Sequence, residues 1–132
     1  MTPEGLIVRA SRHEPKETMD RLAAAVSARG ATVVARIDHA AAAAAVGLAL
    51  PPTEVLVFGN PRAGTPLMQA AQTIGIDLPL RALVWRDGSG VTRVGYNDPR
   101  WLARRHGAEV GAEAILKAMA DFLAAVADEA AT

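Results

Sequence analysis

The segment from Phe58 to Thr65, with the sequence FGNPRAGT, carries the residue types best suited to hold a ligand. Asparagine followed by proline favours the start of a helix, and such a start offers backbone N–H groups and a partial positive charge to an anion. Arg62 adds a guanidinium that pairs with a carboxylate or phosphate through two parallel hydrogen bonds. We therefore expect one oxyanion to face the N–H groups of residues 62–65 and the Arg62 side chain. The predicted ligand-binding residues are Gly59, Asn60, Arg62, Gly64 and Thr65.

The same segment does not match the known nucleotide-binding turns. It lacks the Gly-Lys-Ser/Thr ending of a P-loop and the Gly-x-Gly-x-x-Gly of a dinucleotide turn. A helix start and one arginine bind an anion weakly, so a physiological ligand needs apolar contacts as well. The candidates for those contacts are Trp85, Tyr96 and Trp101. The alternative interpretation is that the segment only caps a helix.

Acid–base chemistry has one set of candidates, Asp38, His39 and His106. A carboxylate beside an imidazole orients the ring and tunes its pKa, as a general acid or base requires. Neighbouring residues on a strand point to opposite faces, so Asp38 and His39 are poorly placed to pair, and Asp38 is a favourable N-cap for the alanine run that follows. These three residues are weak catalytic candidates, and the sequence favours a protein that is not an enzyme.

Metal, cofactor and nucleophile chemistry find little support in the residue types. The three histidines are widely separated, the chain has no cysteine, and no serine stands in a Gly-x-Ser-x-Gly turn. We expect no metal site, no bound cofactor and no hydrolase centre.

The charge balance argues against nucleic acid or a membrane surface as a partner. The chain has 14 basic and 14 acidic residues, so it lacks the positive potential that such partners attract. Residues 81–106 hold six arginines and two aspartates, whereas residues 107–132 hold one lysine and five acids. We expect these two segments to pair, within the chain or across a dimer; an arginine surface for an anionic ligand is the alternative.

The hydrophobic pattern places these candidates on alternating strands and helices. Strands are predicted at 6–10, 32–38, 54–58, 80–86 and 91–96, the first with its apolar residues at positions 6, 8 and 10 and the last two joined as an antiparallel hairpin. Helices are predicted at 15–30, over the alanines up to residue 47, from residue 60 to about 73, at 100–106 and near the C-terminus. The apolar stripe of that last helix is predicted to be Ile115, Met119, Phe122 and Val126. The order β-α-β-(α)-β-α-β-β-α-α indicates an α+β fold, with an antiparallel or mixed sheet of about five strands and helices mainly on one face.

Length and composition favour a single domain. The 132 residues suffice for one hydrophobic core, and 29 of them are alanine, which is typical of closely packed helices. No apolar run reaches the roughly 20 residues of a membrane span, and the N-terminus does not have the pattern of a secretion signal, so we expect a soluble cytoplasmic protein.

Five ordered motifs resemble domain-of-unknown-function family 302. The motifs are Arg36–Ala42, Leu50–Glu54, Phe58–Pro61 continuing to Gly64–Met68, Asp77–Leu80 and Tyr96–Pro99. The resemblance extends from about Leu6 to Phe122, so residues 1–132 are interpreted as one domain of this family. It implies a small prokaryotic α+β domain with a curved antiparallel sheet, often a homodimer, and it implies no reaction.

The residues and the resemblance together favour a non-enzymatic, homodimeric module that binds a small anionic ligand or a partner at residues 59–65. An enzyme that uses Asp38, His39 or His106 as acid or base is the alternative, and it requires these side chains to converge in a pocket. A purely structural, oligomerising protein is a further alternative, because alanine-rich helices pack closely and leave little room for a cavity.

Overall fold

The structure is a computed structural model that describes residues 2–132. Its centre is a five-stranded sheet in the order β1-β5-β4-β3-β2, in which each pair of neighbours is antiparallel. The strands are β1 (Leu6–Ala10), β2 (Thr32–Asp38), β3 (Thr53–Gly59), β4 (Leu80–Arg86) and β5 (Thr92–Asn97). The predicted hairpin is the pair β4 and β5. The first strand of the chain, β1, pairs with β5 and forms an edge of the sheet.

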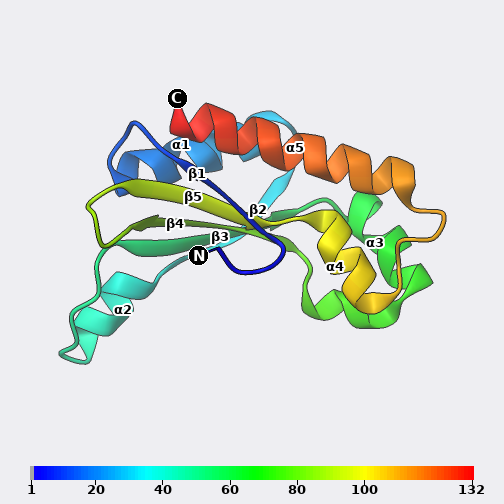
Figure 1. The fold of residues 1–132 in the computed structure, drawn as a ribbon, viewed down its shortest axis with the longest axis horizontal. Helices are drawn as coiled ribbons and strands as arrows, with labels where there is room; N and C mark the ends of the chain where they lie inside the picture. Colours follow the sequence, from blue (N-terminus) through cyan, green and yellow to red (C-terminus); the bar gives the residue numbers. More distant parts are fainter. Residues whose placement is uncertain (1) are drawn as a thin grey trace.

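The helices form a second layer and a cluster at one end of the sheet (Figure 1). Helices α1 (Pro15–Ala28) and α5 (Glu113–Ala131) pack on each other and on one face of the sheet. Helix α3 (Pro61–Ala70), the 3-10 helix η1 (Gln72–Ile76) and α4 (Pro99–His106) gather at one end, and α2 (His39–Ala45) projects from the other end, away from α1 and α5. The α+β architecture with helices mainly on one face, predicted from the sequence, is confirmed.

Two hydrophobic cores hold these layers together. The larger core joins the helix-covered face of the sheet to α1 and the C-terminal half of α5, with Leu22, Leu56, Phe58 and Leu123 fully or almost fully buried. Burying each such side chain contributes about 1.5 to 3 kcal/mol. The smaller core, around Leu67, lies between α3, η1, α4 and the N-terminal half of α5. Helix α5 therefore spans both cores and fixes the cluster of short helices against the sheet.

The apolar residues Leu6 and Val8 of β1 lie on the face of the sheet away from the helices. Ile7 lies opposite Tyr96 and Arg9 opposite Val94, two residues of the larger core, so positions 7 and 9 share the helix-covered face. Leu6 and Val8 are half-buried on the other face of the sheet. On the helix-covered face the Arg9 Nη1 atom lies 2.7 Å from an Asp128 carboxylate oxygen of α5, so a charged side chain occupies that position at the edge of the sheet.

The predicted stripe of α5 is displaced by about one residue. Met119 and Val126 are buried as predicted, but the other large residues of the buried face are Leu116 and Leu123 rather than Ile115 and Phe122, which are only half-buried. The predicted helix from residue 60 also ends earlier than expected, at Ala70, before η1 begins.

Candidate functional site

A cleft of about 670 Å³ opens beside the segment that was predicted to bind a ligand. Its walls come from the C-terminal end of α1, the facing ends of β2 and β3, helix α3, the residues that lead into β4, and α5. All five predicted ligand-binding residues line this cleft, namely Gly59, Asn60, Arg62, Gly64 and Thr65. The sequence therefore predicted one wall of a real cleft, and the fold supplies the others.

The rest of the lining is mainly apolar. Its larger side chains are Met68, Leu78, Ile115, Met119 and Phe122. The Phe122 ring packs on Phe58 of the core with 6.1 Å between the ring centroids, which holds it at the border between core and cleft. Sequence reasoning missed this wall because it treated the apolar residues of the last helix as a single stripe that faces the core.

The charge of the cleft is positive. Arg29 and Arg62 line it, and among residues 2–132 no acidic side chain does. The Nη1 atom of Arg29 lies 2.6 Å from a Glu129 carboxylate oxygen, so this guanidinium is already partly neutralised. Arg62 makes no ion pair within the described residues. Of the two arginines in the lining, Arg62 therefore has its charge free for a ligand as far as residues 2–132 are concerned, whereas Arg29 shares its charge with Glu129. The sequence did not single out Arg29 as a candidate.

The N–H groups at the start of α3 already have partners. The Asn60 side-chain oxygen accepts a hydrogen bond from the Arg62 N–H at 2.9 Å. The Asn60 carbonyl oxygen accepts from the N–H groups of Ala63 at 2.9 Å and Gly64 at 3.1 Å. Three of the N–H groups expected to face an oxyanion are thus satisfied within the chain, so an anion in the cleft depends on guanidinium groups and not on the helix start.

Gly59 is needed for packing between two segments. A Cβ atom at this position would lie 3.2 Å from the Cβ atom of Pro79, which is closer than ordinary contacts allow. A Cβ atom at Gly64 would make ordinary contacts, the nearest at 3.7 Å from Leu78. The first glycine therefore lets β3 end close to the segment that enters β4, and the second has no comparable steric reason.

The aromatic residues predicted to add apolar contacts lie elsewhere. Trp85 lies over Gly95 on the sheet face away from the helices. A Cβ atom added at Gly95 would lie 3.0 Å from the Trp85 ring. Tyr96 is in the larger core, and Trp101 covers Gly5, whose φ of +79° favours glycine. In the described part of the chain none of the three lines the cleft, because the strand register directs Trp85 and Tyr96 to other surfaces and Trp101 lies on α4. That prediction was wrong, and residues of α5 take the place assigned to them.

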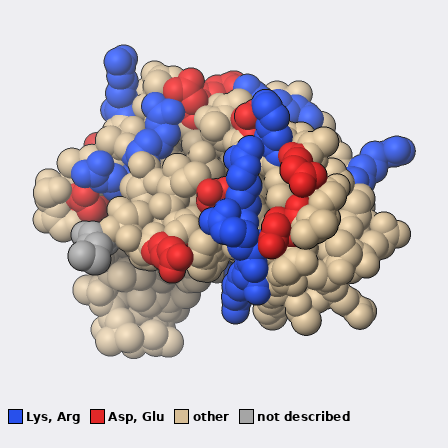
Figure 2. Space-filling model, turned by 45° about the vertical axis from the view of Figure 1, so that its right-hand side comes forward, with Lys and Arg blue, Asp and Glu red and all other residues tan. Residues whose placement is uncertain are grey.

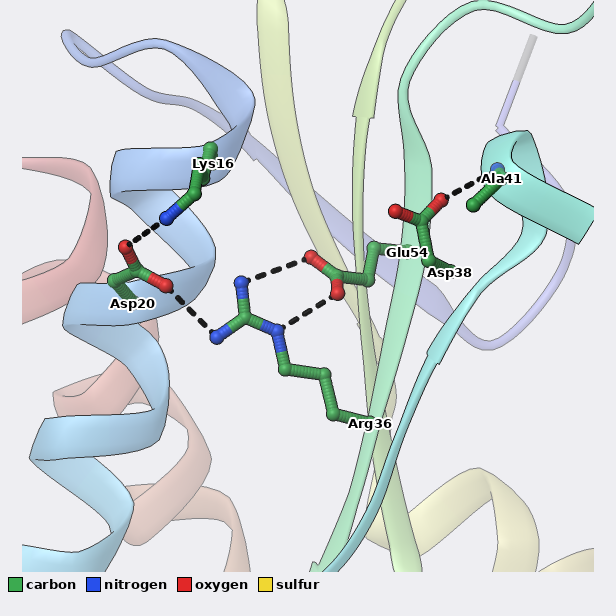
Figure 3. A network of polar contacts seen from close by, with 6 residues as sticks. All are labelled: Lys16, Asp20, Arg36, Asp38, Ala41 and Glu54. Atoms are coloured by element: carbon green, nitrogen blue, oxygen red, sulfur yellow. Dashed lines mark hydrogen bonds and ion pairs between the residues drawn. The ribbon is translucent and has the colours of Figure 1, made fainter.

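The three acid–base candidates do not converge. Asp38 caps α2, since its carboxylate accepts a hydrogen bond from the Ala41 N–H at 2.9 Å (Figure 3). His39 is the exposed first residue of α2. His106 ends α4 at the opposite end of the sheet (Figure 1). The arrangement that an acid–base enzyme requires is therefore missing for this set of residues.

His106 instead belongs to a cluster that sequence reasoning did not find. Its Nε2 atom lies 2.5 Å from an Asp77 carboxylate oxygen, and its Nδ1 atom lies 2.9 Å from the Thr73 hydroxyl. Asp77 also accepts a hydrogen bond from Arg105 at 2.7 Å. Because both ring nitrogens are engaged and the side chain is 8 % exposed, the ring ties α4 to η1. The partners lie 29 and 33 residues away in sequence, too far for any local pattern to indicate them.

A second polar network joins α1 to the edge of the sheet (Figure 3). Arg36 of β2 donates two hydrogen bonds to Glu54 at 2.7 and 3.1 Å and one to Asp20 at 2.8 Å. Lys16 lies 3.1 Å from the other Asp20 oxygen. The hydrogen bonds from Arg36 and then Lys16 lower the pKa of Asp20, and the Glu54 carboxylate raises the pKa of Arg36. These groups satisfy one another, so the network is structural.

The predicted pairing between residues 81–106 and 107–132 is not found within residues 2–132. The arginines of the first segment that form ion pairs contact Glu14, Asp77 and Asp87. The acids of the second segment that do so contact Arg9, Arg29 and Lys117. Figure 2 shows basic and acidic side chains side by side on one face of the molecule. The charges that form ion pairs have their partners outside the other segment, so within residues 2–132 the two segments do not neutralise each other.

The fold and the cleft define a small α+β domain with an antiparallel sheet covered on one face. The chain belongs to the family described as domain of unknown function DUF302, whose model matches residues 7–126. The fold is also that of an uncharacterized conserved DUF302 protein from Bacillus stearothermophilus in a crystal structure, with a TM-score of 0.85, 20 % sequence identity, and coverage of 97 % of this chain and 99 % of that one. The family resemblance of the motifs is confirmed.

Two curated relatives carry another name. A protein of Brucella suis biovar 1 named fluoride-specific ion channel FluC 1 is 50 % identical over 115 residues, which are 87 % of this chain and 45 % of that protein. A Brucella melitensis biotype 1 protein named fluoride-specific ion channel FluC 2 is 50 % identical over 115 residues, 87 % of this chain and 43 % of that protein. The chain thus spans less than half the length of these relatives. None of the helices in residues 2–132 has the length and apolar character needed to cross a membrane.

Proposed function

We propose that this chain is a non-enzymatic module whose cleft holds a small anionic ligand beside residues 59–65. The observation that carries the proposal is the charge of the lining, in which Arg29 and Arg62 face a cleft that, for residues 2–132, contains no acidic side chain. A guanidinium presents a planar fork of N–H donors that matches the two oxygens of a carboxylate or phosphate. Arg62 provides the first contact, since Arg29 must share its charge with Glu129.

The contacts of His106 and Asp38 support a role without catalysis. An acid–base enzyme needs a titratable group with a free atom that reaches the substrate. His106 uses both ring nitrogens for contacts within the chain, and Asp38 caps a helix. The enzyme alternative therefore receives no support from the geometry of these residues.

The experiment that tests this proposal is a titration of the labelled protein with phosphate, sulfate and acetate, followed through backbone amide resonances. The amides of residues 59–65 are expected to shift in the wild-type protein. The Arg62→Gln variant is expected to lose most of this response. The matched control is Arg104→Gln, which removes an exposed arginine of α4 outside the cleft and is expected to leave the response intact. Absence of any shift in the wild-type protein, or an equal response of all three proteins, contradicts the proposal.

The name of the curated relatives favours a second candidate function, in which this domain binds fluoride as part of a fluoride-specific protein. The support is the 50 % identity to part of proteins named fluoride-specific ion channels. On this proposal the anion in the cleft is fluoride, and the same amides respond to fluoride at lower concentration than to chloride. Equal responses to the two halides contradict it.

The module acts as a homodimer in this proposal. Support comes from residues 39–50, here called the α2 arm, which projects from the sheet (Figure 1). Val46 is 72 % and Leu48 66 % exposed, and within the described chain no residue of α2 is buried. A seven-residue helix has little stability by itself, so contact with a second copy would stabilise it. A two-fold axis would cover the same apolar surface on both subunits.

A further inference from the structure

We propose that the ligand of the cleft is an amphipathic carboxylate, with its charged group at Arg62 and its apolar chain along α5. This inference rests on the proposed anion-binding function and adds the chemical class of the ligand. Three properties of the cleft carry it, namely its size, its apolar wall and the sign of its charge.

The cleft is large for a bare inorganic anion. Its volume of about 670 Å³ lies within the range of roughly 300 to 1,000 Å³ that is typical of sites for whole organic molecules. A phosphate or fluoride ion bound at Arg62 would leave most of this volume to water in contact with apolar side chains. A ligand with an apolar body fills the same volume and removes that contact.

The part of the apolar wall that α5 supplies borders the cores without being buried in them. Ile115, Ala118 and Phe122 recur three and four residues apart, so they form one stripe on α5 that lines the cleft. The larger core is filled by a different stripe of the same helix, which includes Leu123 and Val126. The first stripe is left half-buried or exposed, and it offers a continuous surface on which an alkyl chain can lie.

The two arginines lie where α1 ends and α3 begins, and most of the large apolar lining residues lie elsewhere. Arg29 ends α1 and Arg62 begins α3, whereas the apolar side chains come mainly from α5 and from the segment that leads into β4. A cleft that combines guanidinium groups with a largely apolar lining matches a molecule with a carboxylate at one end and a hydrocarbon chain at the other. The absence of acidic lining residues within positions 2–132 disfavours an amine in the same place.

Chain length is the variable that tests the inference. Affinities for acetate, butanoate, hexanoate and octanoate are measured by calorimetry, with the methyl resonances of Met68 and Met119 as reporters of the cleft. Each buried methylene is expected to raise affinity about fourfold. Octan-1-ol, which has the chain without the charge, is expected to bind at least about tenfold more weakly than octanoate.

The matched variants each replace one exposed alanine of α5 by phenylalanine. Ala118→Phe places a ring in the cleft and is expected to abolish the gain with chain length while acetate still binds. Ala124→Phe introduces the same ring outside the cleft and is expected to leave the gain unchanged.

The outcomes separate this inference from the proposed function. Binding of acetate and phosphate with no gain for octanoate overturns the inference and keeps the anion-binding proposal. Failure of all anions to bind overturns both. Sedimentation with phosphatidylglycerol vesicles without binding of free octanoate indicates a membrane surface as the partner, and it also overturns the inference.

Discussion

At the scale of single residues, Asn60 determines what the candidate site can offer an anion. Its side chain and its carbonyl oxygen accept the N–H groups at positions 62, 63 and 64. The helix start is therefore a closed cap, and in the proposed function the anion meets the Arg62 guanidinium instead. The residues that the sequence predicted to bind a ligand do line the cleft, but the sequence did not indicate which of their atoms remain available. That depends on the cap geometry.

Asp20 allows a prediction about pH. Its pKa lies below the usual value of 3.8 because Arg36 and Lys16 hydrogen-bond to the carboxylate. A lowered folded-state pKa means that the stabilisation is fully present above about 3.8 and is lost as the pH falls through the folded-state pKa. Since the side chain is 48 % exposed, solvent screens these contacts. We expect Asp20→Asn to cost about 0.2 to 1 kcal/mol at pH 7.

The difference between wild type and Asp20→Asn is expected to shrink when urea unfolding is repeated near pH 2.5. Asp121→Asn serves as the control, because within residues 2–132 Asp121 pairs with Lys117 alone, on an exposed turn of α5, and is expected to show a smaller difference at pH 7. A difference for Asp20→Asn that stays constant between the two pH values contradicts the assigned role of the network.

At the scale of elements, α5 serves two purposes with two adjacent stripes. Leu123 is 1 % exposed in the larger core, whereas Ile115 is half-buried at the cleft. Leu123→Ala is expected to lower the free energy of unfolding by about 2 to 5 kcal/mol, because it leaves a cavity in a packed core. Ile115→Ala is expected to cost clearly less. Chemical denaturation of both variants measures the difference, and a larger loss for Ile115→Ala would show that the two faces of α5 have been assigned the wrong way round.

The elements that the sequence predicted well have sharp boundaries. The strand over residues 80–86 and the hairpin that follows it are marked by alternating apolar residues and by Asp87-Gly88-Ser89-Gly90. The facing of α5 is less clear, because alanines between the larger residues make both Ile115–Phe122 and Leu116–Leu123 acceptable apolar pairs at a spacing of seven. Only contact with the two cores decides between them.

At the scale of the whole molecule, the cleft is assembled from segments that are far apart in sequence. The cleft brings together Arg29, Arg62 and Phe122. It does so because β2 begins beside the end of β3 and α5 crosses that end of the sheet. Local patterns predicted the wall that contains residues 59–65. The opposite wall and the second arginine depend on the packing of α5 and α1, which no local motif specifies.

The α2 arm gives the whole-molecule prediction for assembly. Light scattering at tens of micromolar is expected to give the mass of a dimer for the wild-type protein. Leu48→Glu places a charge in the apolar surface of the arm and is expected to give a monomer. Val110→Glu, at a position that is 85 % exposed in the loop before α5, is the control and is expected to remain dimeric. A monomeric wild-type protein, or a Leu48→Glu protein that remains dimeric, contradicts an interface at the arm.

The cleft is proposed to bind an anion through Arg62, and the affinity of the Arg62→Gln variant relative to wild type for one carboxylate tests this. A well-formed charge-assisted pair contributes roughly 1.5 to 3 kcal/mol, so we expect a loss of at least about tenfold in affinity, with Arg104→Gln unchanged. The amide shifts that accompany binding are expected to map to residues 59–65 and to α5. Equal affinities of wild type and Arg62→Gln, or shifts that map away from the cleft, would show that Arg62 does not hold an anion in the cleft.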